Sequence, residues 1–339
     1  QHTFTVSTTP VNDAPVISGD GIDLPDGTEH TGTGTIAIAD LLTDAGYSDA
    51  DSGASSGIAI TGVTGNSIWQ YTTDGGDNWF QVSSVSESSA ILLDASASLR
   101  YVPDFENGET ATITFRAWDQ TSGTATNGSS QFRSNVSTNG GSTAFSANAA
   151  TASIVLTDVN DSPSISPDDV ALTPTDEDTT SGPVTVSDLL TDAGYNDPDT
   201  GASAGGIALT GSAGNGTWQY STDSGANWFD VGSVSWGAAL LLKPDAQLRY
   251  IPDGDNGETA SLTFKGWDQT DGTAADGATR STYNITTTGG LTAFSFQEAD
   301  ATLTVTPVND APVVTDLSDS PVYTAGGAAV AIVGSAALG

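Results

Sequence analysis

The residues best suited to chemistry in this chain are clusters of Asp, Glu and Asn that lie beside Gly or Pro. Three clusters share almost the same phrase: VNDAP at 11–15, VNDSP at 159–163 and VNDAP at 308–312. Carboxylate and backbone carbonyl oxygens that converge from flexible turns are the ligands that Ca²⁺ prefers, usually six to eight at a time. The phrases therefore predict calcium sites, and the alternative is that the same residues only form Asx turns and solvated corners.

The acidic phrases mark a repeat of about 149 residues. The segment WQYTTDGGDNWF at 69–80 returns as WQYSTDSGANWF at 218–229, and LRYVPDFENGETATITFRAWDQT at 99–121 returns as LRYIPDGDNGETASLTFKGWDQT at 248–270. Similarity at a fixed period is the signature of an array of folding units. The expected organisation is the last strand of a preceding repeat at 1–15, complete repeats at 16–163 and 164–312, and the start of a further repeat at 313–339.

The composition limits the partners that such a chain can have. It contains 42 Asp plus Glu against 7 Lys plus Arg, a formal charge of -35, which excludes binding to nucleic acid or to an anionic membrane. A chain with this charge repels itself unless cations neutralise it. Its 7 Trp, 8 Tyr and 10 Phe indicate packed cores, and the lack of Cys excludes disulfides and thiolate metal sites. No apolar run reaches the roughly 20 residues needed to span a bilayer.

Nothing in the sequence assembles a catalytic site. The two histidines, His2 and His30, are not copied between repeats, and neither lies in a nucleophile motif or an HExxH motif. A glycosidase needs one acid kept protonated in an apolar cleft, whereas the acids here lie in Gly, Asn and Pro turns that keep them ionised. We therefore expect no enzymatic activity.

The central phrase, DVNDSP at 158–163, resembles the DxNDxP linker of cadherins and of the cadherin-like repeats in very large bacterial surface proteins. The resemblance extends over both complete repeats. In that family the linker chelates calcium between consecutive domains. The DxD element of the family resembles NDPDTG at 196–201, and the AxD and NGE phrases resemble RAWDQTSG, KGWDQTDG and the two NGE segments.

The resemblance implies a central site drawn from both repeats and the linker. Its ligands would be Glu29, Glu109, Asp158, Asn160, Asp161, Asp197, Asp199 and Asp268. The further candidate calcium ligands are Asn12, Asp13, Asp49, Asp51, Asp119, Glu177, Asp178, Glu258, Asn309 and Asp310.

Two departures from the family pattern distinguish the sites. The position of Asp158 is occupied by Pro10 and Pro307 at the outer phrases, so those sites should bind calcium more weakly. Glu29 is followed by His30, whereas the second copy reads EDT, which leaves open whether the first opening segment ligates at all.

The elements that must position these residues are short strands. Alternating apolar runs bounded by Gly, Asp, Asn and Ser predict antiparallel strands joined by tight turns. A helix-like stretch at 38–47 and its copy at 186–195 are expected to close at Gly46 and Gly194. The expected fold is all-β: tandem Greek-key antiparallel β-sandwiches of the cadherin or immunoglobulin-like kind, with extended hairpins.

A long polar insertion separates the last two strands of each repeat, at 121–145 and 270–294. It is too long for a plain turn. One interpretation is an extended hairpin that projects from the sandwich. The other is a ligand-facing loop anchored by Arg133 and Arg280, which are rare cations in this chain.

The tryptophans divide into copied and uncopied residues. The copied aromatics are expected to fill the space between the sheets. Trp236 is not copied and stands where the first repeat has Glu87, so we expect it to face water. There it is a candidate contact for a sugar or a partner, and the alternative is an ordinary isolated surface residue.

These observations favour a non-enzymatic extracellular structural region: calcium-stiffened repeats in the stalk of a bacterial cell-surface or secreted adhesin, with adjacent repeats of the same chain as partners. One alternative is a calcium-dependent module that binds polysaccharide or cell-surface glycan through Trp236 and the insertion. A second alternative is a self-assembling surface filament subunit.

Overall fold

The computed structural model describes residues 9–166, 169–311 and 325. The chain divides into two compact units: Gln1–Asp161 with Pro198–Gly201, and Ser162–Asp197 with Ala202–Gly339. The division falls at Asp161, two residues before the expected repeat boundary. Of the expected terminal segments, residues 1–8 and all of 313–339 except 325 lie outside the described residues.

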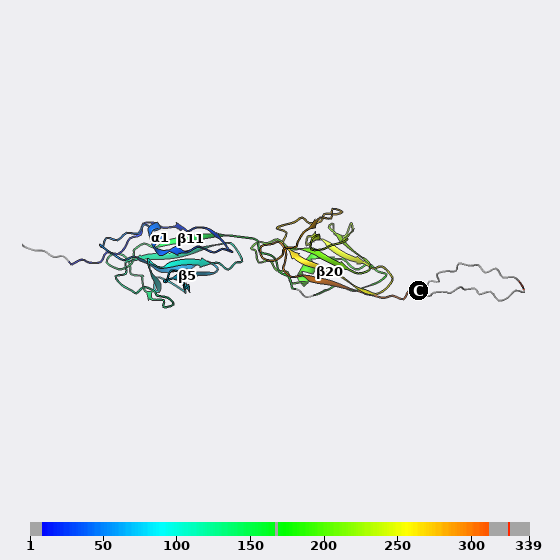
Figure 1. The fold of residues 1–339 in the computed structure, drawn as a ribbon, viewed down its shortest axis with the longest axis horizontal. Helices are drawn as coiled ribbons and strands as arrows, with labels where there is room; N and C mark the ends of the chain where they lie inside the picture. The colour runs from blue at the N-terminus through cyan, green and yellow to red at the C-terminus, as the bar shows by residue number, and fades with distance from the viewer. Residues whose placement is uncertain (1–8, 167–168, 312–324, 326–339) are drawn as a thin grey trace, which may run out of the picture. The chain divides into compact units, whose positions relative to one another are not determined.

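The described part of the first unit forms two β-sheets (Figure 1). The hydrogen-bonded order of the larger sheet is β1 (Ile22–Asp23), β11 (Ala150–Thr157), β9 (Glu109–Trp118), β4 (Gly57–Thr64), β7 (Ala90–Asp94) and β10 (Arg133–Ser134), with β2 (Gly27–Thr28) also paired to β11. The smaller sheet has the order β3 (Ile36–Ala37), β8 (Ser98–Val102), β5 (Ile68–Thr72) and β6 (Phe80–Gln81). β1 and β2 run parallel to β11, and the other pairings of this unit are antiparallel.

The described part of the second unit repeats this topology. Its larger sheet has the order β12 (Val170–Ala171), β22 (Ala299–Thr306), β20 (Glu258–Trp267), β15 (Gly206–Ala213), β18 (Ala239–Leu242) and β21 (Thr282–Tyr283), with β13 (Thr175–Asp176) paired to β22. Its smaller sheet has the order β14 (Val184–Thr185), β19 (Gln247–Ile251), β16 (Thr217–Ser221) and β17 (Phe229–Asp230). In both units the chain passes repeatedly from one sheet to the other, so the fold is the expected all-β Greek-key sandwich.

The core of each sandwich follows from the alternation of its strands. In β9, Ala111, Ile113, Phe115 and Ala117 are buried in the main core of the first unit, while residues between them are partly exposed. Tyr71 of β5 belongs to the same core from the opposite sheet. Because successive side chains of a strand point to opposite faces, one face of β9 fills the space between the sheets.

A short helix follows the first strand of each smaller sheet. α1 spans Ile38–Asp44 and α2 spans Val186–Asp192. Gly46 has a φ of +64° and donates its N–H to Thr43 O, while Tyr47 donates to Leu42 O. These two bonds form a Schellman motif, which confirms the expected helix end at Gly46; Gly194 ends α2 with the same bonds.

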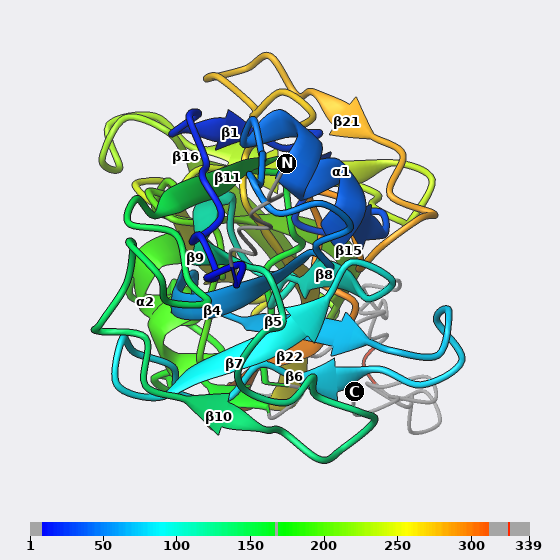
Figure 2. The same cartoon turned by 90° about the vertical axis from the view of Figure 1, so that its left-hand side faces the viewer.

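The insertion at 121–145 packs against the larger sheet instead of projecting from the sandwich. Its strand β10 pairs with β7, as Figure 2 shows, and Val136, Ala144 and Phe145 are buried in a second apolar cluster with Trp118. The residues at 270–294 form the equivalent cluster in the second unit. This packing covers the outer face of β4, whose first five residues are all buried.

The tryptophans that recur in both repeats lie in three different environments. Trp69 lies in the core between the sheets, 5.2 Å from Tyr101 by ring centroids. Trp118 is buried as expected, but under the insertion on the other face of the sheet. Trp79 is only half-buried, and the guanidinium of Arg100 lies 4.2 Å from its ring centroid. Among the helices of the described residues, none is long and apolar enough to cross a membrane.

Candidate metal centre

The candidate site of the first unit is built by the parallel pairing of β2 with β11. The register places Gly27 opposite Leu156 and Thr28 opposite Thr157. Glu29 extends this pairing by donating its backbone N–H to Thr157 O at 3.2 Å. The side chain of Glu29 is thereby directed at the linker that follows β11, where its Oε1 accepts the N–H of Val159 at 2.8 Å.

Three ligand groups meet beside this linker: Glu29, His30 and Asp161. Their ligand atoms all lie within 4.8 Å of one another. His30 Nε2 is 3.1 Å from Asp161 Oδ1 and 3.7 Å from Glu29 Oε1. Glu29 is 0% exposed, whereas His30 and Asp161 are half-buried. We refer to these three residues as the first-unit cluster.

The first-unit cluster contains buried polar atoms that the described residues do not satisfy. Glu29 Oε2 and Asp161 Oδ2 are inaccessible to solvent and have no hydrogen-bond partner among those residues, and His30 Nε2 is buried against the carboxylates of Asp161 and Glu29. Leaving a buried polar atom unpaired is costly, and the cost is greater for a charged group. A divalent cation bound by these atoms would remove that cost.

The charges of the first-unit cluster also favour a bound cation. Burial is the main cause that raises the pKa of Glu29, and the negative charges of Asp158 and Asp161 raise it further. Burial also raises the pKa of Asp161, against the favourable effect of His30. His30 already lowers the pKa of both carboxylates, and a bound divalent cation would supply further positive charge to the ionised forms. The residues therefore fit a divalent cation.

The second unit builds the same arrangement around Glu177, which is 2% exposed. Its backbone N–H donates to Thr306 O at 3.1 Å, and its Oε1 accepts the N–H of Val308 at 2.7 Å. Glu177 Oε2 and Asp176 Oδ1 are buried and have no hydrogen-bond partner within the described residues. Asp178, in the position of His30, is exposed.

Two further predicted ligands, Glu109 and Glu258, accept hydrogen bonds within their own units. Glu109 accepts the N–H of Asn66 at 2.6 Å and the hydroxyl of Tyr101 at 2.5 Å. Glu258 makes the same two bonds in the second unit, with Asn215 and Tyr250. The burial of Tyr101 and its bond to Glu109 raise the pKa of that tyrosine.

Asp158 is exposed and lies at the edge of the first-unit cluster. Its Oδ1 accepts the N–H of Gly108 at 3.0 Å. A Cβ on Gly108 would approach the backbone nitrogen of Asp158 to 2.5 Å, so only glycine allows this close approach. In the second unit Pro307 occupies the equivalent place beside Gly257.

The phrase at 11–15 is tied to the first unit by local hydrogen bonds. Asn12 Nδ2 donates to Asp119 Oδ2 at 2.9 Å, and the N–H of Asp13 donates to Asp51 Oδ2 at 2.9 Å. Asp51 in turn donates its N–H to Asp49 Oδ1 at 2.8 Å. Asp119 is 2% exposed and also accepts two bonds from Thr121. These carboxylates already serve as turn acceptors.

The remaining predicted ligands lie as follows. Asp199 belongs to the segment 198–201, which groups with the first unit, and its carboxylate accepts the N–H of Asp161 at 3.1 and 3.2 Å. Asn160 Nδ2 donates to Asp161 O, and Asp197 accepts the hydroxyl of Tyr195 at 3.2 Å. Asp268 is buried and accepts two bonds from Thr270; Asn309 and Asp310 are exposed, with Asn309 Nδ2 donating to Asp310 O.

Sequence reasoning did not include His30 among the ligands. The available signal was that His30 is one of two histidines in the chain and replaces an Asp of the second copy. Its place beside Asp161 depends on the parallel pairing of β2, a two-residue strand that no alternating pattern announces.

The candidate glycan contacts lie on the second unit. Trp236 is 42% exposed, as expected, and its ring centroid is 4.6 Å from Lys265 Nζ. In the first unit the equivalent residues, Glu87 and Arg116, form an ion pair at 3.0 Å. The guanidinium of Arg280 donates to the carbonyls of Val231 and Ser233, so it fastens the insertion to the rest of the unit.

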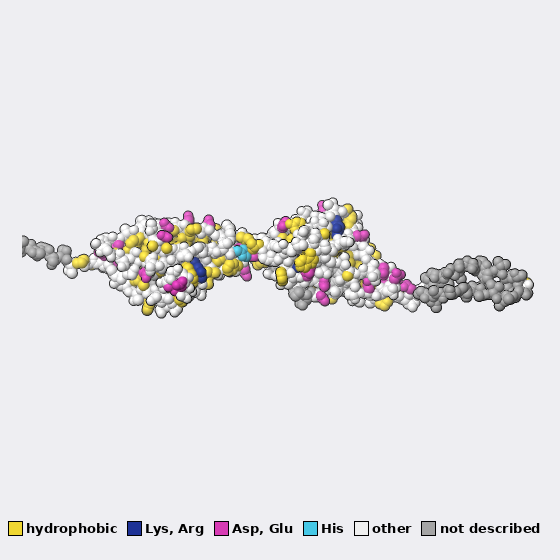
Figure 3. Space-filling model, in the orientation of Figure 1, with side chains coloured by type: hydrophobic (Ala, Val, Ile, Leu, Met, Phe, Trp, Pro, Cys, Tyr) yellow, Lys and Arg dark blue, Asp and Glu magenta, His cyan; other side chains and the backbone are white. Residues whose placement is uncertain are grey.

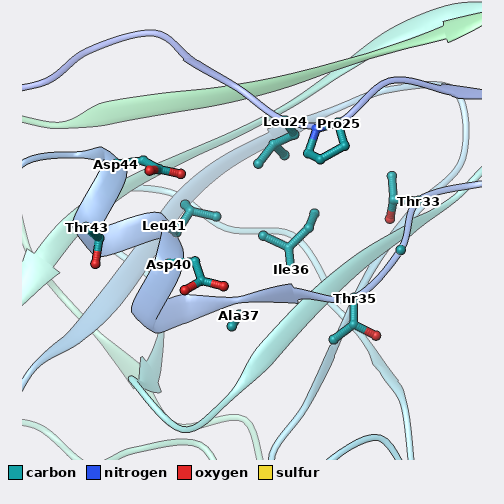
Figure 4. A pocket seen from close by; sticks show the side chains of 11 residues that line it. Leu24, Pro25, Thr33, Thr35, Ile36, Ala37, Asp40, Leu41, Thr43 and Asp44 are labelled. Atoms are coloured by element: carbon teal, nitrogen blue, oxygen red, sulfur yellow. The ribbon is translucent and has the colours of Figure 1, made fainter.

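The visible surface of the described residues carries scattered acidic side chains and few basic ones (Figure 3). The first unit also has a cleft of about 430 Å³, shown in Figure 4. Leu24 and Pro25 line one side of this cleft, and residues 33–37 and α1 line the other. Among the described residues that line it, Asp40 and Asp44 carry the only titratable side chains, and the first-unit cluster is not part of this lining.

No protein-family model matches this chain, and no curated protein matches it. One solved structure that it resembles is that of CfaE, the adhesive subunit of the CFA/I fimbria of enterotoxigenic Escherichia coli. That similarity covers 89% of this chain and 100% of the CfaE chain, at 8% sequence identity and a TM-score of 0.27. These values carry no argument about function.

Proposed function

We propose that this chain is a non-enzymatic tandem-repeat region in the stalk of a bacterial cell-surface or secreted adhesin, stiffened by divalent cations. One observation carries the proposal. Each unit buries a glutamate, Glu29 or Glu177, that binds the N–H of the residue two positions after the last strand and keeps one buried oxygen without a partner among the described residues.

The position of these glutamates explains why a cation would act mechanically. Val159 and Asp161 belong to the segment through which the chain leaves the first unit, and both contact the first-unit cluster. A cation held there would fix this segment to its unit, because metal binding neutralises the clustered carboxylates and sets their orientation. A repeated site of this kind would turn flexible linkers into stiff ones.

The ion proposed for oxygen-only ligand sets is calcium. The resemblance to cadherin-like linkers and the excess of acidic residues both support an extracellular setting, where calcium sites need a Kd of only about 10⁻⁴–10⁻³ M. The partners in this proposal are neighbouring repeats of the same chain.

Thermal melting with and without calcium tests the proposal. Calcium at about 100 times its Kd stabilises a domain by about 2.7 kcal/mol. For a domain of this size that raises Tm by roughly 5–10 °C. Glu177→Gln should abolish the calcium response of the second unit, whereas Glu106→Gln, at an exposed position of the first unit, should leave it unchanged. The proposal fails if calcium raises neither transition, or if Glu177→Gln responds like the parent chain.

A second candidate function is glycan binding by the second unit. Trp236, Leu291 and Phe296 are 42%, 54% and 71% exposed, and the first unit has Glu87, Ser142 and Ala147 at these positions. Lys265 Nζ contacts both the ring of Trp236 and the carbonyl oxygen of Phe296, at 4.6 and 2.7 Å. An exposed aromatic face of this kind could stack on a sugar ring.

Polysaccharide pull-down separates this candidate from a purely mechanical role. We expect Trp236→Ala to abolish retention on any polysaccharide that the parent chain binds, while Phe132→Ala, at an exposed residue of the first unit, keeps it. Retention that survives Trp236→Ala would remove the candidate.

A further inference from the structure

The two units differ at one residue of an otherwise shared cation site. The segment GTEHTGT at 27–33 corresponds to TDEDTTS at 175–181, so His30 stands where the second unit has Asp178. The backbone around the two residues is the same: the preceding glutamate pairs with the last strand and accepts an N–H from the following linker. The same backbone thus presents an imidazole in one unit and a carboxylate in the other.

The imidazole of His30 is directed into the first-unit cluster. Nε2 lies 3.1 Å from Asp161 Oδ1 and 3.7 Å from Glu29 Oε1. Nε2 is buried, and its contact with Asp161 Oδ1 is an ion pair only when the imidazole is protonated. Glu29 Oε2 and Asp161 Oδ2 are buried and have no hydrogen-bond partner in the part of the chain that the structure describes. Each of the three side chains therefore offers a ligand atom to one region, and these ligand atoms lie within 4.8 Å of one another.

The spacing of these atoms suits a small ion with short bonds. Ligands of a tetrahedral zinc ion with bonds of 2.0–2.1 Å lie about 3.3 Å apart. The two distances from His30 Nε2, 3.1 and 3.7 Å, lie on either side of that value. Calcium could also be held at such spacing, so the chemistry of the ligand atoms must decide between the ions.

The nitrogen ligand favours a transition-metal ion over calcium. Calcium takes six to eight oxygens, and it gains little from an imidazole. An imidazole nitrogen suits zinc, copper, iron and nickel, and two carboxylates complete a three-ligand protein set that leaves one position for water. Glu177 and its neighbours Asp176 and Asp178 offer oxygen only.

We propose that Glu29, His30 Nε2 and Asp161 bind a transition-metal ion of the Zn²⁺ class, whereas the site around Glu177 binds Ca²⁺. This inference rests on the proposed function, because it assumes that both sites take divalent cations. The two units would then hold cation sites with the same backbone arrangement but different metal selectivity. The difference would come from one residue, His30 in the first unit and Asp178 in the second.

Zinc binding to the full chain in excess calcium tests the inference. The parent chain should bind one zinc ion more tightly than His30→Asp does, by about 100-fold or more, because His30 would be a direct ligand and even the loss of an outer-shell partner costs 10–100-fold. His30→Asp should instead gain a calcium response at the first unit. Equal zinc affinity of His30→Asp and the parent chain would overturn the inference.

A spectroscopic measurement keeps the test independent of folding defects. In His2→Asn, His30 is the sole histidine, and zinc should shift its imidazole resonances at one equivalent. Resonances that stay unchanged through the titration would refute ligation by Nε2. A parent chain that binds zinc at the first unit but shows no calcium response at the second would contradict the proposed function and the calcium half of this inference, and would leave only the zinc site standing.

Discussion

At the scale of single residues, two buried glutamates form the centre of the proposed cation sites. Glu29 and Glu177 are almost fully buried, and each places one oxygen on a linker N–H. A buried carboxylate whose second oxygen is unpaired lowers stability in the absence of a cation. Both residues are therefore expected to destabilise the metal-free units and to stabilise the loaded ones.

This reasoning predicts the pH dependence of the metal-free first unit. The pKa values of Glu29 and Asp161 are raised by folding, so their contribution to stability is present below their unfolded pKa and is lost as pH rises through the folded pKa. Lowering the pH of metal-stripped protein from about 7 to about 5 should therefore raise the Tm of the first unit. Calorimetry at a series of pH values measures this directly.

Glu29→Gln is the matched variant for that experiment. It should weaken the pH dependence of the metal-free protein, because the titrating group is removed. Asp74 has the opposite effect on the pH dependence of stability. Hydrogen bonds from Asn78 lower its pKa to about 2, so its contribution to stability is lost only as the pH falls towards that value. A parent Tm that is flat or falls between about pH 7 and about pH 5 would contradict the role given to Glu29 and Asp161.

Part of this site was predictable from sequence. The VND phrases and the acidic opening segments identified Glu29, Asp158 and Asp161, because a known linker pattern specifies oxygen ligands at those spacings. His30 was not predictable from that pattern, which contains no nitrogen ligand. The hydrogen bonds of Asp119 with Asn12 and of Glu109 with Asn66 also required the structure, since these donors lie 107 and 43 residues away in sequence.

At the scale of elements, the polar insertion is the main departure from the sequence-based expectation. Its Gly, Ser, Thr and Asn content predicted an exposed hairpin or loop. Yet Val136, Ala144 and Phe145 are buried with Trp118 in the second apolar cluster on the outer face of the larger sheet, here named the outer cluster. A few apolar residues at wide spacing produce no periodic signal, so the packing could not be read from the pattern. The outer cluster in turn explains why β4 is buried on both faces.

Truncation of Phe145 tests whether the insertion is structural. Phe145 is 4% exposed, and Phe145→Ala should cost about 3–5 kcal/mol of unfolding free energy in the first unit. Phe132→Ala is the control within the same insertion, because Phe132 is 43% exposed and should change stability little. Chemical denaturation measures both. Equal effects of the two variants would show that the insertion adds no core.

At the scale of the whole molecule, the two units share one topology and differ at a few positions. The copies share their sheets, helix ends and buried glutamates. They differ at His30 against Asp178, which lie at the proposed cation sites, and at Glu87 against Trp236, which lie on the surface. The sequence predicted the all-β sandwich well, because alternating strands are a strong signal.

Small-angle scattering of the full chain is the most direct test of the central claim. In saturating calcium and zinc, the account predicts a larger and better-defined maximum dimension than in chelator, because cations would fix the linker to its unit. Glu29→Gln should remove this difference, whereas Glu106→Gln should preserve it. A maximum dimension that is the same with cations and with chelator would contradict the proposal that cations stiffen the chain.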